Sequence, residues 1–286
     1  MSNSIAERAM GVTLRVKTWQ ARKLDKDATA EVNENHGAKS DAGRYNKLLL
    51  PKKALEPISK IVSASRAYVY ANTTPWSDNG IRALLSANYF DHMEKIRDFQ
   101  TEFDDAVDVF CEEYNAHREQ ARFELNSLFK AEDYPDVCEI RGKFEFRHVV
   151  SGLPVAGDFR VDMADDEIER IRTQITDENA RNVKTAMDSV WKQLLDTVSH
   201  MGNRLRDPNA KFHSTTITNI EDLIERIPRL NLTDDATLTQ YAQEIKDCLV
   251  GYTAADIKQD PTVRQGVARE ADRITKKMAG LFQAAV

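Results

Sequence analysis

The sequence predicts a mainly α-helical protein, organised around a long antiparallel, coiled-coil-like helical hairpin with a small β-hairpin at its turn and a flanking helical bundle. Three observations support this fold class. Residues 81–129 and 165–205 contain no proline, and their only glycine is Gly202. Both stretches carry apolar residues at steps of three and four, the spacing of one helix face. The composition, 41% apolar and 30% charged with few Gly and Pro, is typical of a helix-rich globular protein.

The first long helix is expected over residues 81–129. At 1.5 Å per residue it would reach roughly 73 Å, a length that favours a helix packed along a partner helix. Its apolar seam has steps of three or four throughout and comprises Leu85, Tyr89, Met93, Ile96, Phe99, Phe103, Val107, Phe110, Tyr114, His117, Ala121, Leu125 and Leu128. The aromatic residues in this seam are typical of core packing.

The second long helix is expected over residues 165–205, beginning at Asp165 and ending before Pro208. Its seam is of comparable length, and the β segment between the two helices supplies a chain reversal. Antiparallel pairing of the two seams is therefore predicted. The second seam comprises Ile168, Ile171, Ile175, Val183, Met187, Val190, Leu194, Val198, Met201 and Leu205.

A β-ribbon is expected over residues 139–163, with one apolar and one charged face. Two alternating apolar and charged runs flank the turn-forming residues 151–154, a pattern that predicts a hairpin. An isolated hairpin is marginal in water, so its apolar face must lie on the helices, pair with the N-terminal strand, or meet another molecule. The candidate partner contacts on that face are Phe144, Phe146 and Phe159.

The chain is expected to divide into three consecutive regions. Residues 1–80 form a basic N-terminal region, in which Val12, Leu14 and Val16 indicate a strand, residues 27–35 a short helix, and Pro51 the start of another helix. Residues 81–210 form the helical hairpin with its ribbon. Residues 211–286 carry shorter helical patterns and are expected to pack on the hairpin.

The charge distribution is asymmetric. Residues 1–70 hold thirteen Lys and Arg against seven Asp and Glu, whereas the remainder is strongly acidic and the whole chain has a net charge of −6. A basic N-terminal region on an otherwise acidic protein can bind nucleic acid, bind an acidic partner, or contact the acidic part of its own chain. The acidic total disfavours a protein that coats DNA along its whole surface.

Two groups of basic residues are candidate contacts for anions or nucleic acid. The loop at residues 37–47 has two glycines beside Lys39, Arg44 and Lys47, and its backbone N–H groups could cradle an anion. Its spacing matches neither a P-loop nor a dinucleotide fingerprint. On the charged face of the ribbon, the basic residues are Arg141, Lys143 and Arg147. An ordinary surface loop and a solvated ribbon face are the structural alternatives.

No catalytic or metal motif is present. The sequence lacks the zinc-protease, nucleophile-elbow and Walker patterns, and its six histidines do not pair at metal-ligand spacing. The three cysteines are far apart, which suggests buried thiols in a reducing cytoplasm. No apolar run approaches the ~20 residues of a membrane span. We therefore predict no catalytic residue, no cofactor, no metal site, no membrane contact and a cytoplasmic location.

Three segments resemble an uncharacterised family of bacteriophage and prophage proteins. They are TWQARKLDKDATAEV at residues 18–32, SLFKAEDYPD at 127–136 and FEFRHVVSGLPVAGDFRVDM at 144–163. Members of that family often accompany a MoxR-type AAA+ ATPase and a von Willebrand factor A-type protein. The resemblance implies a phage origin, location in the host cytoplasm and an ATPase partner. It implies no activity and no catalytic residues.

The leading hypothesis is a non-enzymatic helical phage protein that acts through protein–protein contacts, as an accessory of an AAA+ ATPase. The alternative is a DNA- or RNA-binding protein that uses the basic N-terminal region and the ribbon. A third hypothesis is an enzyme with a nucleotide site at residues 37–47. Homo-oligomerisation, including pairing of the hairpin between two chains, is left open.

Overall fold

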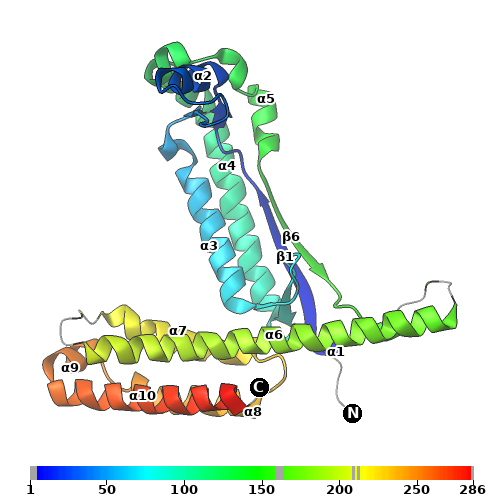
Figure 1. Ribbon diagram of the computed structural model, residues 1–286, viewed down its shortest axis with the longest axis vertical. Coiled ribbons are helices and arrows are strands. Elements are labelled where there is room, and N and C mark those ends of the chain that lie inside the picture. Colours follow the sequence, from blue (N-terminus) through cyan, green and yellow to red (C-terminus); the bar gives the residue numbers. More distant parts are fainter. Residues whose placement is uncertain (1–4, 159–160, 162–163, 208–209, 211–212, 285–286) are drawn as a thin grey trace. The chain divides into compact units, whose positions relative to one another are not determined.

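The computed structural model describes residues 5–158, 161, 164–207, 210 and 213–284 (Figure 1). The protein is mostly helical with a small antiparallel sheet, as predicted. The chain forms two compact units. Unit 1 comprises Met1–Thr13, Tyr70–Phe90 and Val150–Val286, and unit 2 comprises Leu14–Val69 and Asp91–Val149. This division differs from the three consecutive regions expected from the sequence, because each unit combines stretches that are distant along the chain.

The regular elements are as follows. The helices are α1 (Ile5–Arg8), α2 (Lys26–Asn35), α3 (Glu56–Asn72), α4 (Tyr89–Leu125), α5 (Val137–Ile140), α6 (Asp165–Arg206), α7 (Ser214–Leu230), α8 (Ala236–Ile245), α9 (Ala254–Gln259) and α10 (Pro261–Ala284). The strands are β1 (Ala9–Lys17), β2 (Arg22–Leu24), β3 (Asn46–Leu48), β4 (Thr74–Pro75), β5 (Arg82–Leu85) and β6 (Glu145–Ser151). One sheet has the order β4-β5-β1-β6, and β2 pairs with β3 in a second sheet.

The first long helix begins later than the sequence suggests. Residues 82–85 form β5, which pairs antiparallel with β1 through Ala9↔Leu85 and also with β4. Ala83, Leu84 and Leu85 are all buried, so this apolar run is a strand covered on both faces. Periodicity alone does not separate such a short buried strand from the first turn of a helix. The expected start at residue 81 is therefore wrong, and α4 begins at Tyr89.

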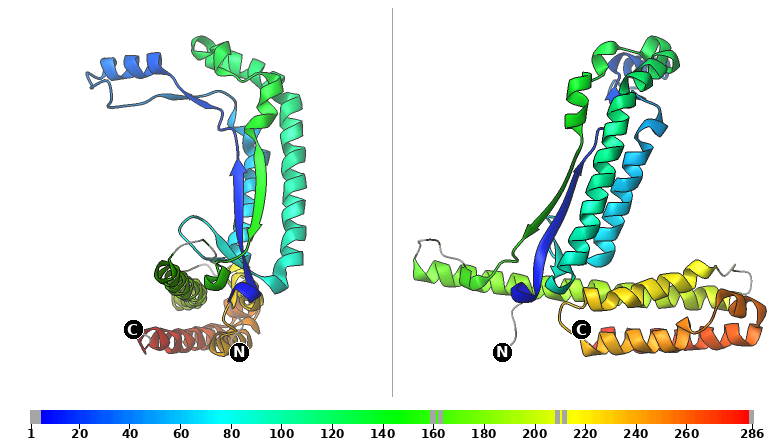
Figure 2. Two further views of the ribbon diagram at one scale, coloured as in Figure 1. Left: turned by 90° about the vertical axis from the view of Figure 1, so that its right-hand side faces the viewer. Right: turned by 180° about the vertical axis from the view of Figure 1, so that it is seen from behind.

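The seam of α4 forms the core of unit 2. The α3 and α4 helices lie side by side, and the buried face of α4 packs with Ile58 and Val62 of α3 (Figures 1 and 2). Phe144 and Phe146, at the start of β6, complete the cluster, with the rings of Phe103 and Phe146 5.5 Å apart. The seam residues buried here are Ile96, Phe99, Phe103, Val107, Phe110, Tyr114 and Ala121.

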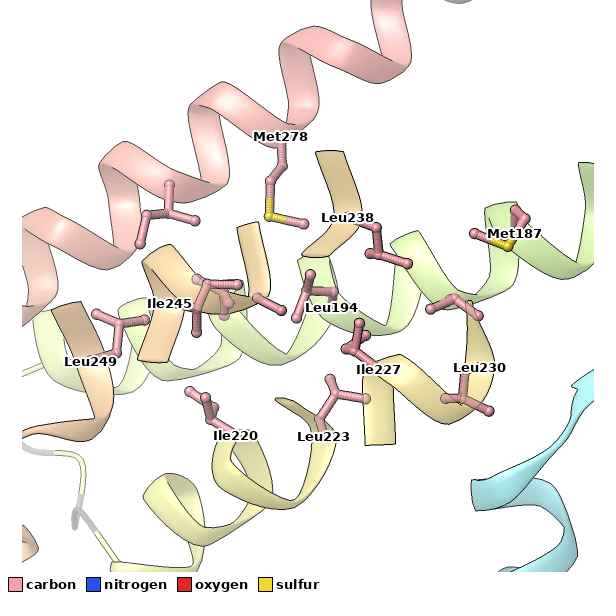
Figure 3. Packing of buried hydrophobic residues seen from close by; sticks show 14 of the residues in the cluster. Met187, Leu194, Ile220, Leu223, Ile227, Leu230, Leu238, Ile245, Leu249 and Met278 are labelled. Carbon is pink, nitrogen blue, oxygen red and sulfur yellow. The ribbon is translucent and has the colours of Figure 1, made fainter. Parts of the chain in front are cut away.

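The second half of α6 forms the core of unit 1. The α7 and α10 helices lie along this half, and α8 adds Leu238 and Ile245 (Figure 3). The α6 seam residues that are buried here are Met187, Val190, Leu194, Val198, Met201 and Leu205. The predicted helix over residues 165–205 is therefore confirmed, and so is the burial of its C-terminal seam.

The predicted antiparallel pairing of the two long helices is not confirmed. The seam of α4 is buried against α3 and β6 within unit 2, and the C-terminal seam of α6 is buried against α7 and α10 within unit 1. Each seam thus meets helices of its own unit. Seam spacing predicted that each helix would be covered on one face, but it carries no information about which element covers it.

Among the described residues, the predicted ribbon contributes one strand. Residues 145–151 form β6, whereas residues 137–143 are helical turns. The described neighbour of β6 is β1, so the observed arrangement is the one in which the ribbon pairs with the N-terminal strand. Phe159, Arg160, Asp162 and Met163, which belong to the expected second strand, lie outside the described residues, and Val161 is not in a strand.

Arg264 caps the C-terminus of α6. Its guanidinium donates hydrogen bonds to the carbonyls of Leu205 (2.9 Å), Arg204 (3.1 Å) and Asp207 (2.7 Å). The last carbonyls of a helix lack partners within the helix, and a cation at that end also interacts favourably with the helix dipole. This contact ties α10 to α6.

We expect Arg264→Gln to lower the unfolding free energy of unit 1 by about 2 kcal/mol, because several carbonyls lose one charged donor. Hydrogen exchange of peptides from the C-terminal turn of α6 measures the effect. Arg269→Gln is the matched control, since the hydrogen bond that Arg269 forms with a described residue goes to the Gln265 carbonyl, one turn away on the same helix. Equal exchange rates in the two variants would show that the cap contributes nothing.

Candidate functional site

The predicted anion loop does not gather its three basic residues. Lys47 lies on β3 with its side chain only 2% exposed. Its ammonium contacts Asp25 Oδ2 at 2.8 Å, Asp133 Oδ2 at 2.7 Å and the Leu128 carbonyl at 2.7 Å. An ammonium has three donors, so this one has none left for an anion. Lys39 and Arg44 are exposed at the surface.

The electrostatics of this cluster agree with a structural role. Burial disfavours the charged form of Lys47, but the hydrogen bonds to Asp133 and Asp25 outweigh burial and raise its pKa. The hydrogen bonds from Lys47 and from the Ala28 amide lower the pKa of Asp25 to about 2. Lys23 also contacts Asp133, at 2.7 Å. Lys23 and Lys47 of the basic N-terminal region are thus paired with carboxylates of unit 2. For these two lysines, the observed arrangement is the one in which the basic region contacts the protein's own acidic residues.

The basic residues of the ribbon are also dispersed. Arg141 lies in a helical turn and contacts Asp104 and Asp108 of α4 at 2.9 and 3.0 Å. These carboxylates raise the pKa of Arg141, against the opposing effect of burial. Lys143 is half-buried in the same turn, and Arg147 is exposed on β6. One of the three candidate phosphate contacts is therefore already paired.

The proposed apolar contacts of the ribbon face inward. Phe144 is 5% exposed and Phe146 is 8% exposed, and both belong to the core of unit 2. Neither is available to a partner, because each packs on the aromatic seam of α4. The expectation for these two residues is wrong, and Phe159 lies outside the described residues.

A buried histidine pair lies in unit 2. The Nε2 atoms of His92 on α4 and His148 on β6 are 3.2 Å apart, and the His92 ring stacks on Tyr68 of α3. Both Nδ1 atoms are buried without a hydrogen-bond partner among the described residues. His92 directly precedes Met93 of the predicted seam, so the sequence places it in the first long helix. The sequence does not indicate its partner, because the pairing depends on the placement of β6 beside α4.

The histidine pair is built to stay neutral. An Nε2–H···Nε2 hydrogen bond requires one ring to donate and the other to accept. Burial and the neighbouring His148 lower the pKa of His92 to about 4, and burial also lowers the pKa of His148. Protonation of the accepting Nε2 would place two Nε2–H groups opposite each other and break this hydrogen bond. The pair therefore suits a pH-sensitive packing contact better than proton transfer.

A pocket of about 310 Å³, which we call the α6 pocket, opens beside the first half of α6 in unit 1. Its walls come from three places: α6, the turn after β4, and the segment after β6. The apolar residues that line it are Trp76, Ile81, Leu153, Pro154, Ile171 and Ile175. The Trp76 ring is only 4% exposed, so it forms a floor and not an open platform.

Uncharged amides dominate the polar part of the α6 pocket. Gln174 and Asn182 form no hydrogen bond with any described residue, whereas Asn179 donates to the Pro154 carbonyl at 2.8 Å. Asn79 accepts hydrogen bonds from Ser77 and from the Ile81 amide. The lining also contains one carboxylate, Glu178, which accepts from Arg181 at 2.6 Å.

The apolar seam of α6 continues past its core. The first half of the helix extends beyond the ends of α7 and α10 (Figures 1 and 2). Ile168, Ile171 and Ile175 are partly exposed there, and among the described residues they belong to neither core cluster. We call these three residues the open seam. Their spacing was visible in the sequence, but the pocket beside them depends on loops that the sequence does not place.

Metal sites and membrane-spanning helices were sought in the part of the chain that the structure describes. Within the described ranges, no group of three or more His, Cys, Asp or Glu side chains is arranged to hold a metal ion. No described helix combines the length and apolar character that a membrane crossing requires. Comparison with protein-family models, with curated proteins and with solved structures finds no match to this chain.

Proposed function

We propose that the protein is non-enzymatic and acts through protein–protein contacts made by the open seam of α6. The observation that carries this proposal is the change in burial along one helix face. Met187 and the seam residues after it are buried, whereas Ile168, Ile171 and Ile175 keep the same periodicity but are partly exposed. An apolar stripe at helical spacing is the surface that a partner protein covers.

The charges around the open seam favour an apolar contact over an electrostatic one. Arg170 contacts Glu167 at 2.8 Å, and Arg172 contacts Glu169 at 2.7 Å. Each of these arginines is paired on its own helix, so the seam offers a partner little unpaired positive charge. Binding there would depend on burial of the isoleucines, each of which contributes about 1 to 3 kcal/mol when fully buried.

The partner suggested by the family resemblance is a MoxR-type AAA+ ATPase, and we propose it as the first protein to test. Binding of DNA or RNA is the weaker alternative, because Lys47 and Arg141 are engaged by carboxylates. Salt-dependent gel shifts that weaken on substitution of exposed Arg147 would support that alternative. The predicted helical hairpin is not needed for either function.

The test is a pull-down of the purified ATPase by the full chain, run beside light scattering of the chain alone. We expect Ile171→Glu to weaken retention of the ATPase at least tenfold, since a carboxylate would be buried against apolar partner atoms. Ala180→Glu is the matched control: Ala180 is exposed on the opposite face of α6. Retention that survives Ile171→Glu, or no retention at micromolar concentration, contradicts the proposal.

A further inference from the structure

We infer that the α6 pocket binds an extended peptide segment that inserts one uncharged apolar side chain between Trp76, Ile171 and Ile175. The inference rests on the proposed function and deepens it by assigning the chemical class of the anchor. Three features of the pocket carry it: its apolar floor, its neutral lining and its unpaired amides.

The apolar floor sets the size of the anchor. A volume of about 310 Å³ lies at the lower end of the range for ligand pockets, which extends from roughly 300 to 1,000 Å³. It suits a single large side chain with the backbone on either side. Side chains that fill such a pocket commonly dominate the affinity of a protein interface.

The neutral lining excludes charged ligands. Glu178, the carboxylate in the lining, is already paired with Arg181. A carboxylate, phosphate or ammonium that entered the pocket would lose its hydration without gaining an opposite charge, which is strongly unfavourable. Nucleotides, acidic peptides and basic tails therefore do not fit this site.

The unpaired amides favour an extended backbone. Gln174 and Asn182 are eight residues apart on α6, or about 12 Å along the helix axis. An extended chain advances about 3.3 Å per residue and exposes both N–H and C=O groups, so about four residues would span the two amides. A helical partner has already satisfied these groups internally. A sugar ring needs an open aromatic face, and Trp76 is buried.

The experiment uses the full chain with ¹³C-labelled isoleucine δ1 methyl groups, observed by NMR. The probes are acetyl-Ala-Leu-Ala-Ala-amide, the same peptide with Glu or Lys in place of Leu, and methyl glucoside. We expect the leucine peptide to shift the Ile171 and Ile175 signals and to leave the buried Ile220 and Ile274 unmoved. The charged peptides should bind at least tenfold more weakly. Equal binding of all three peptides, or shifts with the glucoside alone, overturns the inference.

A set of variants separates this inference from the proposed function. Ile175→Trp should fill the pocket and abolish the peptide shifts of Ile171, whereas Ile175→Val should keep them. Ile168 belongs to the open seam but does not line the pocket, so Ile168→Glu should weaken the ATPase and leave the leucine peptide bound. If Ile168→Glu weakens the ATPase but Ile175→Trp does not, the seam functions and the pocket inference fails. If neither does, both fail. Dimers that Ile175→Trp disrupts would identify the occupant as a second copy and overturn the inference.

Discussion

Replacing Lys47 with Met is expected to lower the unfolding free energy of unit 2 by about 3 kcal/mol. The substitution keeps the apolar stem but leaves Asp25 without a cationic partner and Asp133 with Lys23 alone, although both carboxylate side chains are only 4% exposed. Removal of one partner from a buried ion cluster leaves an uncompensated charge, which costs far more than the cluster itself contributes. The Leu128 carbonyl loses its donor as well.

Hydrogen exchange of peptides from β3 and α4 measures this loss, and peptides from α10 in unit 1 provide the internal control. The triple variant Lys47→Met, Asp25→Asn, Asp133→Asn should recover part of the stability, because no buried charge remains. Lys39→Met is the matched surface control, since Lys39 is exposed. A Lys47→Met protein as stable as the parent would show that water hydrates the carboxylates in the folded state.

Acidification from pH about 6.5 to about 4 is expected to destabilise unit 2 through the histidine pair. The folded-state pKa of His92 is depressed to about 4 from an unfolded value of 6.5. Between pH 6.5 and 4, His92 therefore binds a proton in the unfolded chain but not in the folded chain. The stability that the neutral, buried His92 contributes is fully present above pH 6.5 and is lost as the pH falls to 4. The expected loss is about 1 to 3 kcal/mol.

Urea unfolding at a series of pH values, followed by hydrogen exchange in α4 and β6, measures this dependence. The double variant His92→Phe, His148→Phe should flatten the profile between pH 4 and 6.5. His117→Gln is the control, because His117 lies near the surface beside Glu113. A profile that keeps its slope in the double variant would assign the acid sensitivity to other groups.

Local patterns predicted the elements better than their contacts. The helices α3 and α6 follow from residue periodicity and from Pro51, because α3 buries one face along its length and α6 buries one face along its second half. The strand β5 was missed, since its buried residues Ala83–Leu85 also match a helix start. What covers each face depends on residues far apart in the chain, and this is why the pairing of the two long helices was not identified.

Candidate sites were less predictable than helices for the same reason. Lys47 has the sequence context of a surface loop, but its partner Asp133 is more than eighty residues away. The pairing of His148 with His92 likewise joins two residues that are far apart in the sequence, so the sequence alone does not indicate it. The open seam was visible as part of the α6 pattern. Its exposure was not, because exposure depends on where α7 and α10 end.

The interleaving of the two units has a consequence for dissecting the protein. The chain passes between units 1 and 2 four times, after Thr13, Val69, Phe90 and Val149. Neither unit is therefore encoded by one uninterrupted stretch of the gene. A premature stop after residue 149 would delete α6 to α10. The β5 strand of unit 1 would remain, but the helices that complete its core would be missing. Function is thus best mapped by point substitutions in the intact chain, because a truncation can leave part of a unit without the residues that complete its core.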